Sequence, residues 1–174
     1  MEAHGYHPFD QRTAIGSRPE SREAVSVLST GKPVTYNTPY HPAYPAAGDA
    51  TLTDGWRGTW TFGDRRWQGW LNADADVTVD LGERMELSRI SMDFLQGRAA
   101  EIWMPREVEI AVSDDGEHFT TLAVVANDIA ADYPKSAYKT FGWTGQAQGR
   151  YVRVCGRIDR SHGGWLFTDE ILVE

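Results

Sequence analysis

The chain has 174 residues, of which 41% are hydrophobic and 24% charged, values that fit one globular domain with a substantial core. Its formal net charge of -8 at pH 7 argues against a nucleic-acid partner, because such binding needs clustered lysines and arginines. The single cysteine, Cys155, excludes an internal disulfide and a cysteine-based zinc site.

The first 30 residues are polar and lack strand alternation, so we expect a linker or docking tail over 1–30 and a folded module over 31–174. The spacing of Ser17-Arg18-Pro19-Glu20 is typical of a capping box and allows a short helix through Glu23-Ala24-Val25. The N-terminus lacks the basic start and apolar core of a signal peptide, and no apolar run approaches a membrane span. Two contexts stay open: a cytoplasmic protein, or a module of a longer secreted chain.

From Gly31 onward, short runs of alternating apolar and polar residues are separated by turn residues. A period of two with one apolar face is typical of strands packed on a core. The expected strands are Val77–Leu81, Ile90–Phe94, Val108–Val112, Phe119–Val125, Tyr138–Trp143, Tyr151–Ile158 and Trp165–Val173. Many short strands with turns between them, and no long helical period, predict an all-β sandwich or barrel.

The alternation also makes a prediction for the cysteine. Val152 and Val154 are expected to face the core, which puts Cys155 on the outer face together with Arg153. A small buried thiol is the commoner fate of a free cysteine, but the alternation favours an outward one.

No pattern of catalytic residues is present in the sequence. It lacks a Gly-x-Ser-x-Gly motif, a His-Glu-x-x-His motif and a phosphate-binding glycine loop, and its 5 histidines are far apart. Asp169 and Glu170 are adjacent carboxylates, but neighbouring side chains of a strand face opposite ways, which is poor geometry for shared acid–base chemistry. The sequence therefore favours a non-catalytic protein.

One stretch imitates a calcium-binding loop. Asn72–Glu83 has oxygen-bearing side chains at the spacing of a helix–loop–helix calcium site. However, Val77 stands where the sharp turn needs glycine, the second half alternates like a strand, and no amphipathic helix flanks it. We interpret this stretch as a loop that enters a strand.

Several short motifs occur in the order seen in discoidin domains, also called factor V/VIII type C or galactose-binding-like domains. They are Ala50–Gly55, Trp67–Trp70, Val77–Gly82, Ser113–Gly116 with Phe119, Arg150–Val154 and Asp169–Ile171. The chain resembles this family over roughly residues 32–174. Within it, the chain looks most like the family 32-type carbohydrate-binding module that follows the catalytic domain in bacterial β-N-acetylhexosaminidases. That closer resemblance is carried by Asn37–Tyr40, Tyr44–Ala46, Phe94–Gln96 and Trp165–Phe167.

The resemblance implies an eight-stranded antiparallel jelly-roll β-sandwich that brings no catalytic residue. It implies extracellular or periplasmic use within a longer secreted protein, where the module holds a glycoside hydrolase on glycans containing galactose or N-acetylhexosamine. The alternative is a structural accessory domain that packs on a neighbouring catalytic domain and binds no sugar. An adhesion module for protein or phospholipid is a third possibility, and the acidic balance disfavours a membrane partner.

Members of the family often hold a structural calcium ion in the loop after the first strand. By the resemblance, carboxylate oxygens would come from Asp54 and Glu170. The remaining ligands would be the hydroxyl and carbonyl of Thr59 and the backbone carbonyls of Thr51, Trp56 and Asp169. This mixed oxygen set suits calcium. Without the resemblance, Asp54-Gly55 is simply a tight turn and Glu170 a strand-edge carboxylate.

Sugars bind to such modules at loops at one end of the sandwich, where an aromatic ring stacks on the sugar and planar polar groups bind its hydroxyls. The candidate residues here are Tyr40, His41, Trp60, Arg65, Arg98, Trp103 and His162. The structural alternatives are a loop anchor beneath Pro105 for Trp103 and core lining for Trp60. The family's galactose-binding histidine, arginine and asparagine have no one-to-one match here, so galactose specificity stays open.

Overall fold

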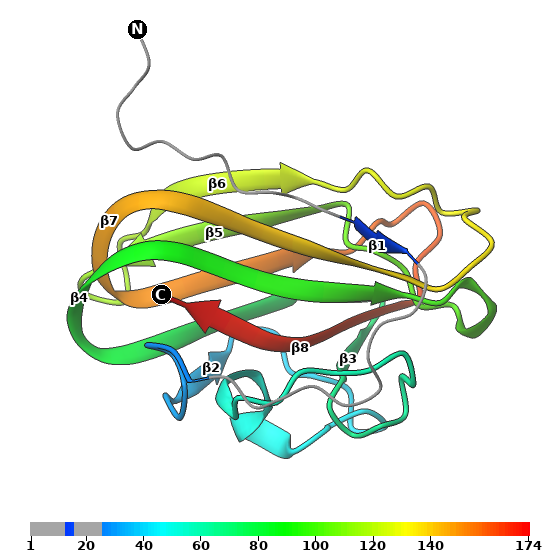
Figure 1. Cartoon of the computed structure of the whole chain (residues 1–174), viewed down its shortest axis with the longest axis horizontal. Coiled ribbons are helices and arrows are strands. Elements are labelled where there is room, and N and C mark those ends of the chain that lie inside the picture. Colours follow the sequence, from blue (N-terminus) through cyan, green and yellow to red (C-terminus); the bar gives the residue numbers. More distant parts are fainter. Residues whose placement is uncertain (1–12, 16–25) are drawn as a thin grey trace, which may run out of the picture.

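The computed structural model describes residues 13–15 and 26–174 of the chain (Figure 1). Its strands are β1 (Thr13–Ile15), β2 (Val34–Tyr36), β3 (Gln68–Leu71), β4 (Ala75–Gln96), β5 (Glu107–Ser113), β6 (Thr120–Ala126), β7 (Ala137–Arg157) and β8 (Trp165–Val173). Two short 3-10 helices, η1 (Gly48–Thr53) and η2 (Arg98–Ala100), interrupt the loops. No helix in the described part is long and apolar enough to cross a membrane. The helix predicted through Glu23-Ala24-Val25 lies outside the described residues.

The long strands β4 and β7 bend together at one end of the molecule (left in Figure 1), so that each has two arms. In β4 the bend coincides with a register shift between Asp80 and Met85. Gly82, within this shift, has a left-handed φ of 89°, which glycine adopts without steric cost. Two predicted strands are therefore the arms of β4, and two others are the arms of β7.

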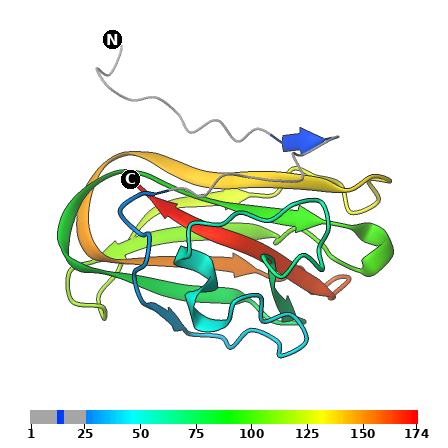
Figure 2. The ribbon, with the colours of Figure 1, turned by 60° about the horizontal axis from the view of Figure 1, so that its bottom comes forward.

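The bends divide the strands into two antiparallel layers, which Figure 2 shows from a second direction. One layer contains β2, the first arm of β4, the second arm of β7, β5 and β6. The other contains β3, β8, the second arm of β4, the first arm of β7 and β1. This arrangement confirms the predicted antiparallel β-sandwich, and Asn72–Glu83 is a loop that enters β4, as expected.

The main core lies between the layers and follows the predicted alternation. Val77 and Val79 of β4, Val108 of β5, and Val152 and Val154 of β7 are all buried in it. Full burial of such a side chain stabilises the fold by about 1.5–3 kcal/mol. A second, smaller cluster of Trp67, Leu95, Ile102 and Phe167 lies on the outer side of the second layer, and the loop between η1 and β3 closes over β8 there (Figure 2).

The expectation of an outward, exposed Cys155 is half wrong. Cys155 does share the outer face with Arg153, since both line one hollow. However, only 6% of its surface is exposed, and the longer side chains of Glu109, Phe119 and Arg153 line the same hollow around the thiol. Burial raises the Cys155 pKa to about 11.

Packing on the sandwich begins before Gly31. The Leu28 amide donates to the Val173 carbonyl at 2.9 Å, and the buried Ser29 hydroxyl donates to the Ile171 carbonyl at 2.8 Å. Further upstream, β1 pairs antiparallel with the start of β7. The described parts of the predicted tail therefore contact the sandwich.

Candidate functional site

Asp169 and Glu170 are adjacent on β8, and both reach the loop between η1 and β3. The register between β4 and β8 shifts between Met92 and Phe94, so that one β4 residue, Asp93, opposes both acids. A bulge of this kind redirects side chains and is common beside functional sites. The opposite orientation expected for neighbouring strand residues therefore does not keep these two carboxylates apart.

Backbone amides of the loop hold both carboxylates. The Gly58 amide donates to Asp169 Oδ2 at 2.7 Å, and the Gly55 amide donates to Glu170 Oε2. A Cβ at Gly58 would lie 2.3 Å from the Trp67 indole, so this close approach of the loop requires glycine. The loop is thus fixed over the two acids by its own backbone.

Glu170 is a buried carboxyl group with one unsatisfied oxygen. It is 2% exposed, and its Oε1 has no hydrogen-bond partner within the described part of the chain. Burial, and next the negative charge of Asp54, raise the Glu170 pKa to about 9. Burial also raises the pKa of Asp54, whose carboxylate accepts a hydrogen bond from the Trp56 amide at 2.8 Å. A buried acid whose ionisation is opposed by the charge of a neighbouring carboxylate is a group that a hard cation would stabilise.

The other expected calcium ligands lie around the same loop, with several oxygens already engaged. The Thr59 hydroxyl donates to Asp64 at 2.8 Å, and its carbonyl accepts from the Trp67 indole at 2.7 Å. The Thr51 carbonyl accepts from the Asp54 amide at 3.3 Å. In the described residues, no three His, Cys, Asp or Glu side chains lie close enough to hold a metal by themselves. A cation at this position would therefore need backbone carbonyls as well as the two acids.

A separate hollow of about 410 Å³ lies beside the first residues of β8, between loops that precede β3. It is lined by Ala43, Tyr44, Pro45 and Ala46 from the loop after β2 and by Phe62, Gly63, Arg65 and Trp67 from the loop before β3. The Tyr44 ring packs on Trp165 and Phe167 at centroid distances of 4.9 and 4.8 Å. Phe62 is 38% exposed. The hollow thus presents an accessible aromatic ring together with a guanidinium group. We call it the aromatic hollow.

Strained backbone occurs in the loops around this hollow. The described non-glycine residues with positive φ are Ala46 (48°), Arg65 (66°), Asn72 (50°) and Glu101 (58°), and all four lie in connections between strands. Such conformations cost energy and cluster at ligand-binding sites. Two of them, Ala46 and Arg65, line the aromatic hollow.

Among the residues predicted to contact sugar, Arg65 lines the aromatic hollow. His41 lies beside it, because its ring is edge-on to Trp165 at 5.0 Å and Trp165 also packs on Tyr44. Tyr40 is directed elsewhere: its hydroxyl donates to Asp49 at 2.7 Å.

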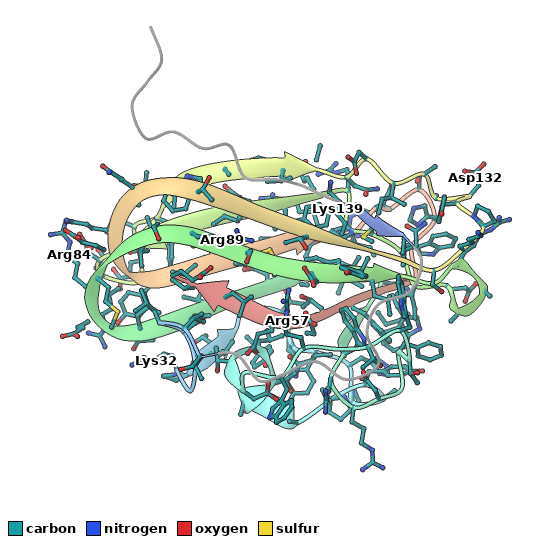
Figure 3. All side chains as sticks on the ribbon, in the orientation of Figure 1. Lys32, Arg57, Arg84, Arg89, Asp132 and Lys139 are labelled. Atoms are coloured by element: carbon teal, nitrogen blue, oxygen red, sulfur yellow. The ribbon has the colours of Figure 1, made fainter. Side chains whose placement is uncertain are left out.

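The remaining four candidates are not among the residues that line the aromatic hollow. Trp103 and His162 pack on each other at 4.8 Å. Arg98 donates to the Asp132 carbonyl at 3.1 Å, at the end of the molecule opposite Arg84 (Figure 3). Trp60 packs on the Tyr138 ring at 5.3 Å. The seven residues therefore do not converge on one hollow.

Two residues of the aromatic hollow, Tyr44 and Phe62, were not among the predicted sugar-contacting residues. Tyr44 belongs to a motif that carries the family resemblance, and Phe62 precedes Gly63 in an aromatic-rich loop. The one local signal for Phe62 in the sequence is an aromatic residue next to a glycine in a loop. Contact between the two loops is a tertiary feature, so their shared hollow carries no local signal.

The comparisons with known proteins agree with this fold. The family model described as F5/8 type C domain matches residues 33–171. The module CpGH89CBM32-5 of Clostridium perfringens, in complex with GalNAc-beta-1,3-galactose, is 20% identical, with 85% of this chain and 99% of that chain covered and a TM-score of 0.57. A Streptococcus pneumoniae fucose binding module is 14% identical, with 85% and 94% covered and a TM-score of 0.59.

A third solved structure is chitosan-binding module 2 of a chitosanase/glucanase from Paenibacillus sp. IK-5, in complex with chitotriose. It is 16% identical, with 84% of this chain and 98% of that chain covered and a TM-score of 0.55. At these identities the three structures show a shared fold. None of the curated proteins matches the sequence.

Proposed function

The chain belongs to the F5/8 type C domain family, and we propose that it acts as a non-catalytic carbohydrate-binding module. We propose further that the module is part of a longer, secreted glycoside hydrolase of the β-N-acetylhexosaminidase type, and that it holds this enzyme on glycans. The solved structures named above, two of them in complex with GalNAc-beta-1,3-galactose and chitotriose, support sugar as the ligand class. The observation that carries the proposal is the aromatic hollow.

The aromatic hollow has the chemistry that a sugar ring needs. Its volume of about 410 Å³ lies within the range of small-molecule sites, about 300–1,000 Å³. The exposed Phe62 ring can stack on the apolar face of a pyranose. The Arg65 guanidinium supplies donors, and the Tyr44 hydroxyl both donates and accepts. The loops are positioned by buried rings of the second cluster, so a ligand meets a preformed surface.

A glycan array probed in calcium-containing buffer tests this function. We expect binding to glycans that contain galactose or N-acetylhexosamine, with strong losses in Phe62→Ala and Arg65→Ala. Matched controls are Val124→Ala, which truncates a 55% exposed apolar side chain on β6, and Arg84→Ala, at the opposite end of the molecule (Figure 3).

If the folded protein bound no glycan, the sugar-binding function would be refuted. A structural accessory domain would then be the better interpretation. Equal losses in the control variants would show that the aromatic hollow is not the site. The presence of an adjoining hydrolase is tested separately. The reading frame that contains this module should also encode a catalytic domain, and its absence would contradict this part of the proposal.

A structural calcium ion at Asp54 and Glu170 is the second part of the proposal. Its support is the buried Glu170 Oε1, which has no hydrogen-bond partner in the described part of the chain, and the negative charge of Asp54, which raises the Glu170 pKa. Asp54 and Glu170 would supply carboxylate oxygens, while Thr59 would add its hydroxyl and carbonyl and Thr51, Trp56 and Asp169 their backbone carbonyls. A bound calcium ion would supply positive charge that neutralises the acids and ties η1 and its following loop to β8.

An extracellular or periplasmic location is also part of the proposal. Calcium modules of extracellular proteins bind the ion weakly, at dissociation constants of about 10⁻⁴–10⁻³ M, which suits a site with few charged ligands. Fractionation of the natural host followed by immunoblotting tests it, and recovery of the protein only from the cytoplasm would contradict it.

A further inference from the structure

The outer face of the first layer carries a second hollow, remote in the fold from the loops of the aromatic hollow. It has a volume of about 180 Å³. It is lined by Glu109 and Ala111 of β5, Phe119 and Thr121 at the start of β6, and Arg153 and Cys155 of β7. These three strands lie side by side in the order β7, β5, β6 (Figure 1). We call this the sheet hollow.

The sheet hollow exists because two short side chains stand among longer ones. Ala111 lies opposite Arg153, and Glu109 lies opposite Cys155. Outward side chains on neighbouring strands are about 4.5–5.5 Å apart, so a diagonal pair of small residues leaves a depression between the longer pair. Ala111 and Cys155 are both buried and form its floor.

The polar groups around this floor are held in place by hydrogen bonds to neighbouring side chains. Arg153 makes a two-pronged contact with Asp76, Nε to Oδ1 at 2.9 Å and Nη2 to Oδ2 at 2.6 Å. Glu109 accepts from the Arg157 guanidinium at 2.6 Å and from the Thr121 hydroxyl at 2.7 Å. Side chains fixed in this way lose little conformational entropy when a ligand binds.

The same contacts select the kind of ligand. The positive charge of Arg153 is balanced by Asp76. Arg157 pairs with both Glu109 and Glu107, and Glu107 also pairs with Arg106, so these two acids and two arginines balance one another. A charged ligand therefore finds no unpaired opposite charge. A neutral polyol can donate to Glu109 and Thr121 through lone pairs that remain available. The Phe119 ring, with the Arg153 guanidinium carbon 6.0 Å from its centroid, adds an apolar wall.

We propose that the sheet hollow is a second carbohydrate subsite, which takes a single neutral pyranose ring. The volume of about 180 Å³ corresponds to about six waters of liquid, which limits the occupant to one ring rather than a chain. This inference rests on the proposed sugar-binding function but adds a site on the sheet face to the one in the loops. Two such sites on one module would let it hold two branches or two strands of a glycan surface.

Two-dimensional NMR titration with free galactose, N-acetylgalactosamine, N-acetylglucosamine and fucose tests the proposal. We expect at least one sugar to shift the amide signals of Ala111, Thr121 and Cys155. Ala111→Leu fills the floor and should abolish these shifts, while the signals of Tyr44 and Phe62 in the aromatic hollow respond as before. The control Ala126→Leu places the same side chain at an exposed β6 position and should change neither response.

Cys155 provides an independent measurement, because it is the single cysteine of the chain. A sugar in the sheet hollow should slow alkylation of this thiol by iodoacetamide, and the protection should persist in Phe62→Ala. Loss of the protection in Phe62→Ala would show that it arises from the aromatic hollow and would overturn the second subsite.

The outcomes separate the two proposals. Shifts at the aromatic hollow without shifts at the sheet hollow refute the second subsite and leave the proposed function intact. Shifts at the sheet hollow that survive Ala111→Leu also refute it. Shifts confined to the sheet hollow support the second subsite and remove the aromatic hollow as the sugar site. No response to any sugar or to the glycan array overturns both.

Discussion

Replacing Glu170 by glutamine should remove the stabilising effect of calcium and leave the calcium-free protein nearly unchanged. With a pKa of about 9, Glu170 is protonated at pH 7 when no cation is bound. Glutamine has nearly the same shape as a protonated glutamate, and its amide oxygen can still accept from the Gly55 amide. The substitution therefore removes the charge that calcium needs without disturbing the loop.

The expected effect of calcium on stability follows from the linkage between ligand binding and unfolding. Keeping Glu170 ionised at pH 7 costs about 3 kcal/mol. Calcium binding must offset this cost before it adds net stability. At a free calcium concentration of about 100 times the apparent Kd, the free energy of unfolding rises by about 2.7 kcal/mol. For a chain of this size, 1 kcal/mol changes the Tm by about 2–4 °C, so the expected rise is roughly 5–11 °C.

Thermal melts followed by circular dichroism measure this effect. The protein is first freed of metal with a chelator, then melted in chelator and in a calcium series. Glu117→Gln, at an exposed loop position, is the matched control and should keep the full rise in Tm. An unchanged Tm for the unaltered protein in calcium would refute the ion site. A full rise in Glu170→Gln would refute the role of this carboxylate.

Three further predictions concern packing and charge. Gly58→Ala should destabilise the fold by about 1–3 kcal/mol, because the added Cβ would lie 2.3 Å from the Trp67 indole. Urea melts should show no such loss for Gly63→Ala, where nothing lies within 4 Å of the added atom. The alkylation rate of Cys155 should rise about tenfold per pH unit until pH approaches its pKa of about 11, and a plateau near pH 9 would contradict its burial. Hydrogen bonds from an arginine and a threonine lower the pKa of Glu109 in the folded protein. The ionised Glu109 therefore stabilises the fold at pH values above its unfolded-state pKa, and this stabilisation is lost as the pH falls through its folded-state pKa. The difference in urea midpoint between Glu109→Gln and the unaltered protein should therefore shrink from pH 7 to pH 3, and a constant difference would count against this ion pair.

Local periodicity was sufficient to predict the class of fold and the faces of its strands. Val108 and Ile110 alternate with Glu107 and Glu109, Val112 continues the same period of two, and the structure buries all three apolar side chains. Likewise Val152 and Val154 are buried as expected. Side-chain direction along a strand is a local property with a period of two, which is why these predictions needed no knowledge of neighbouring strands.

The sequence also predicted that the candidate residues lie in loops, but it did not predict which of them lie close together. Arg65 was predicted to contact sugar, and the structure places it in a hollow with Tyr44 and Phe62. Those two rings come from loops before and after η1. Only the packing of both loops against β8 brings them together.

The sequence by itself determined the all-β class, the inward and outward faces, and the family resemblance that nominated Asp54 and Glu170. Tertiary structure alone decided the bulge opposite Asp93, which lets Asp169 and Glu170 reach the same loop. It also decided the burial of Cys155, whose outward direction was predicted but whose surroundings were not. The physical reason is common to both: a chain's own pattern sets the direction of each side chain, whereas register and neighbouring strands determine what that side chain meets.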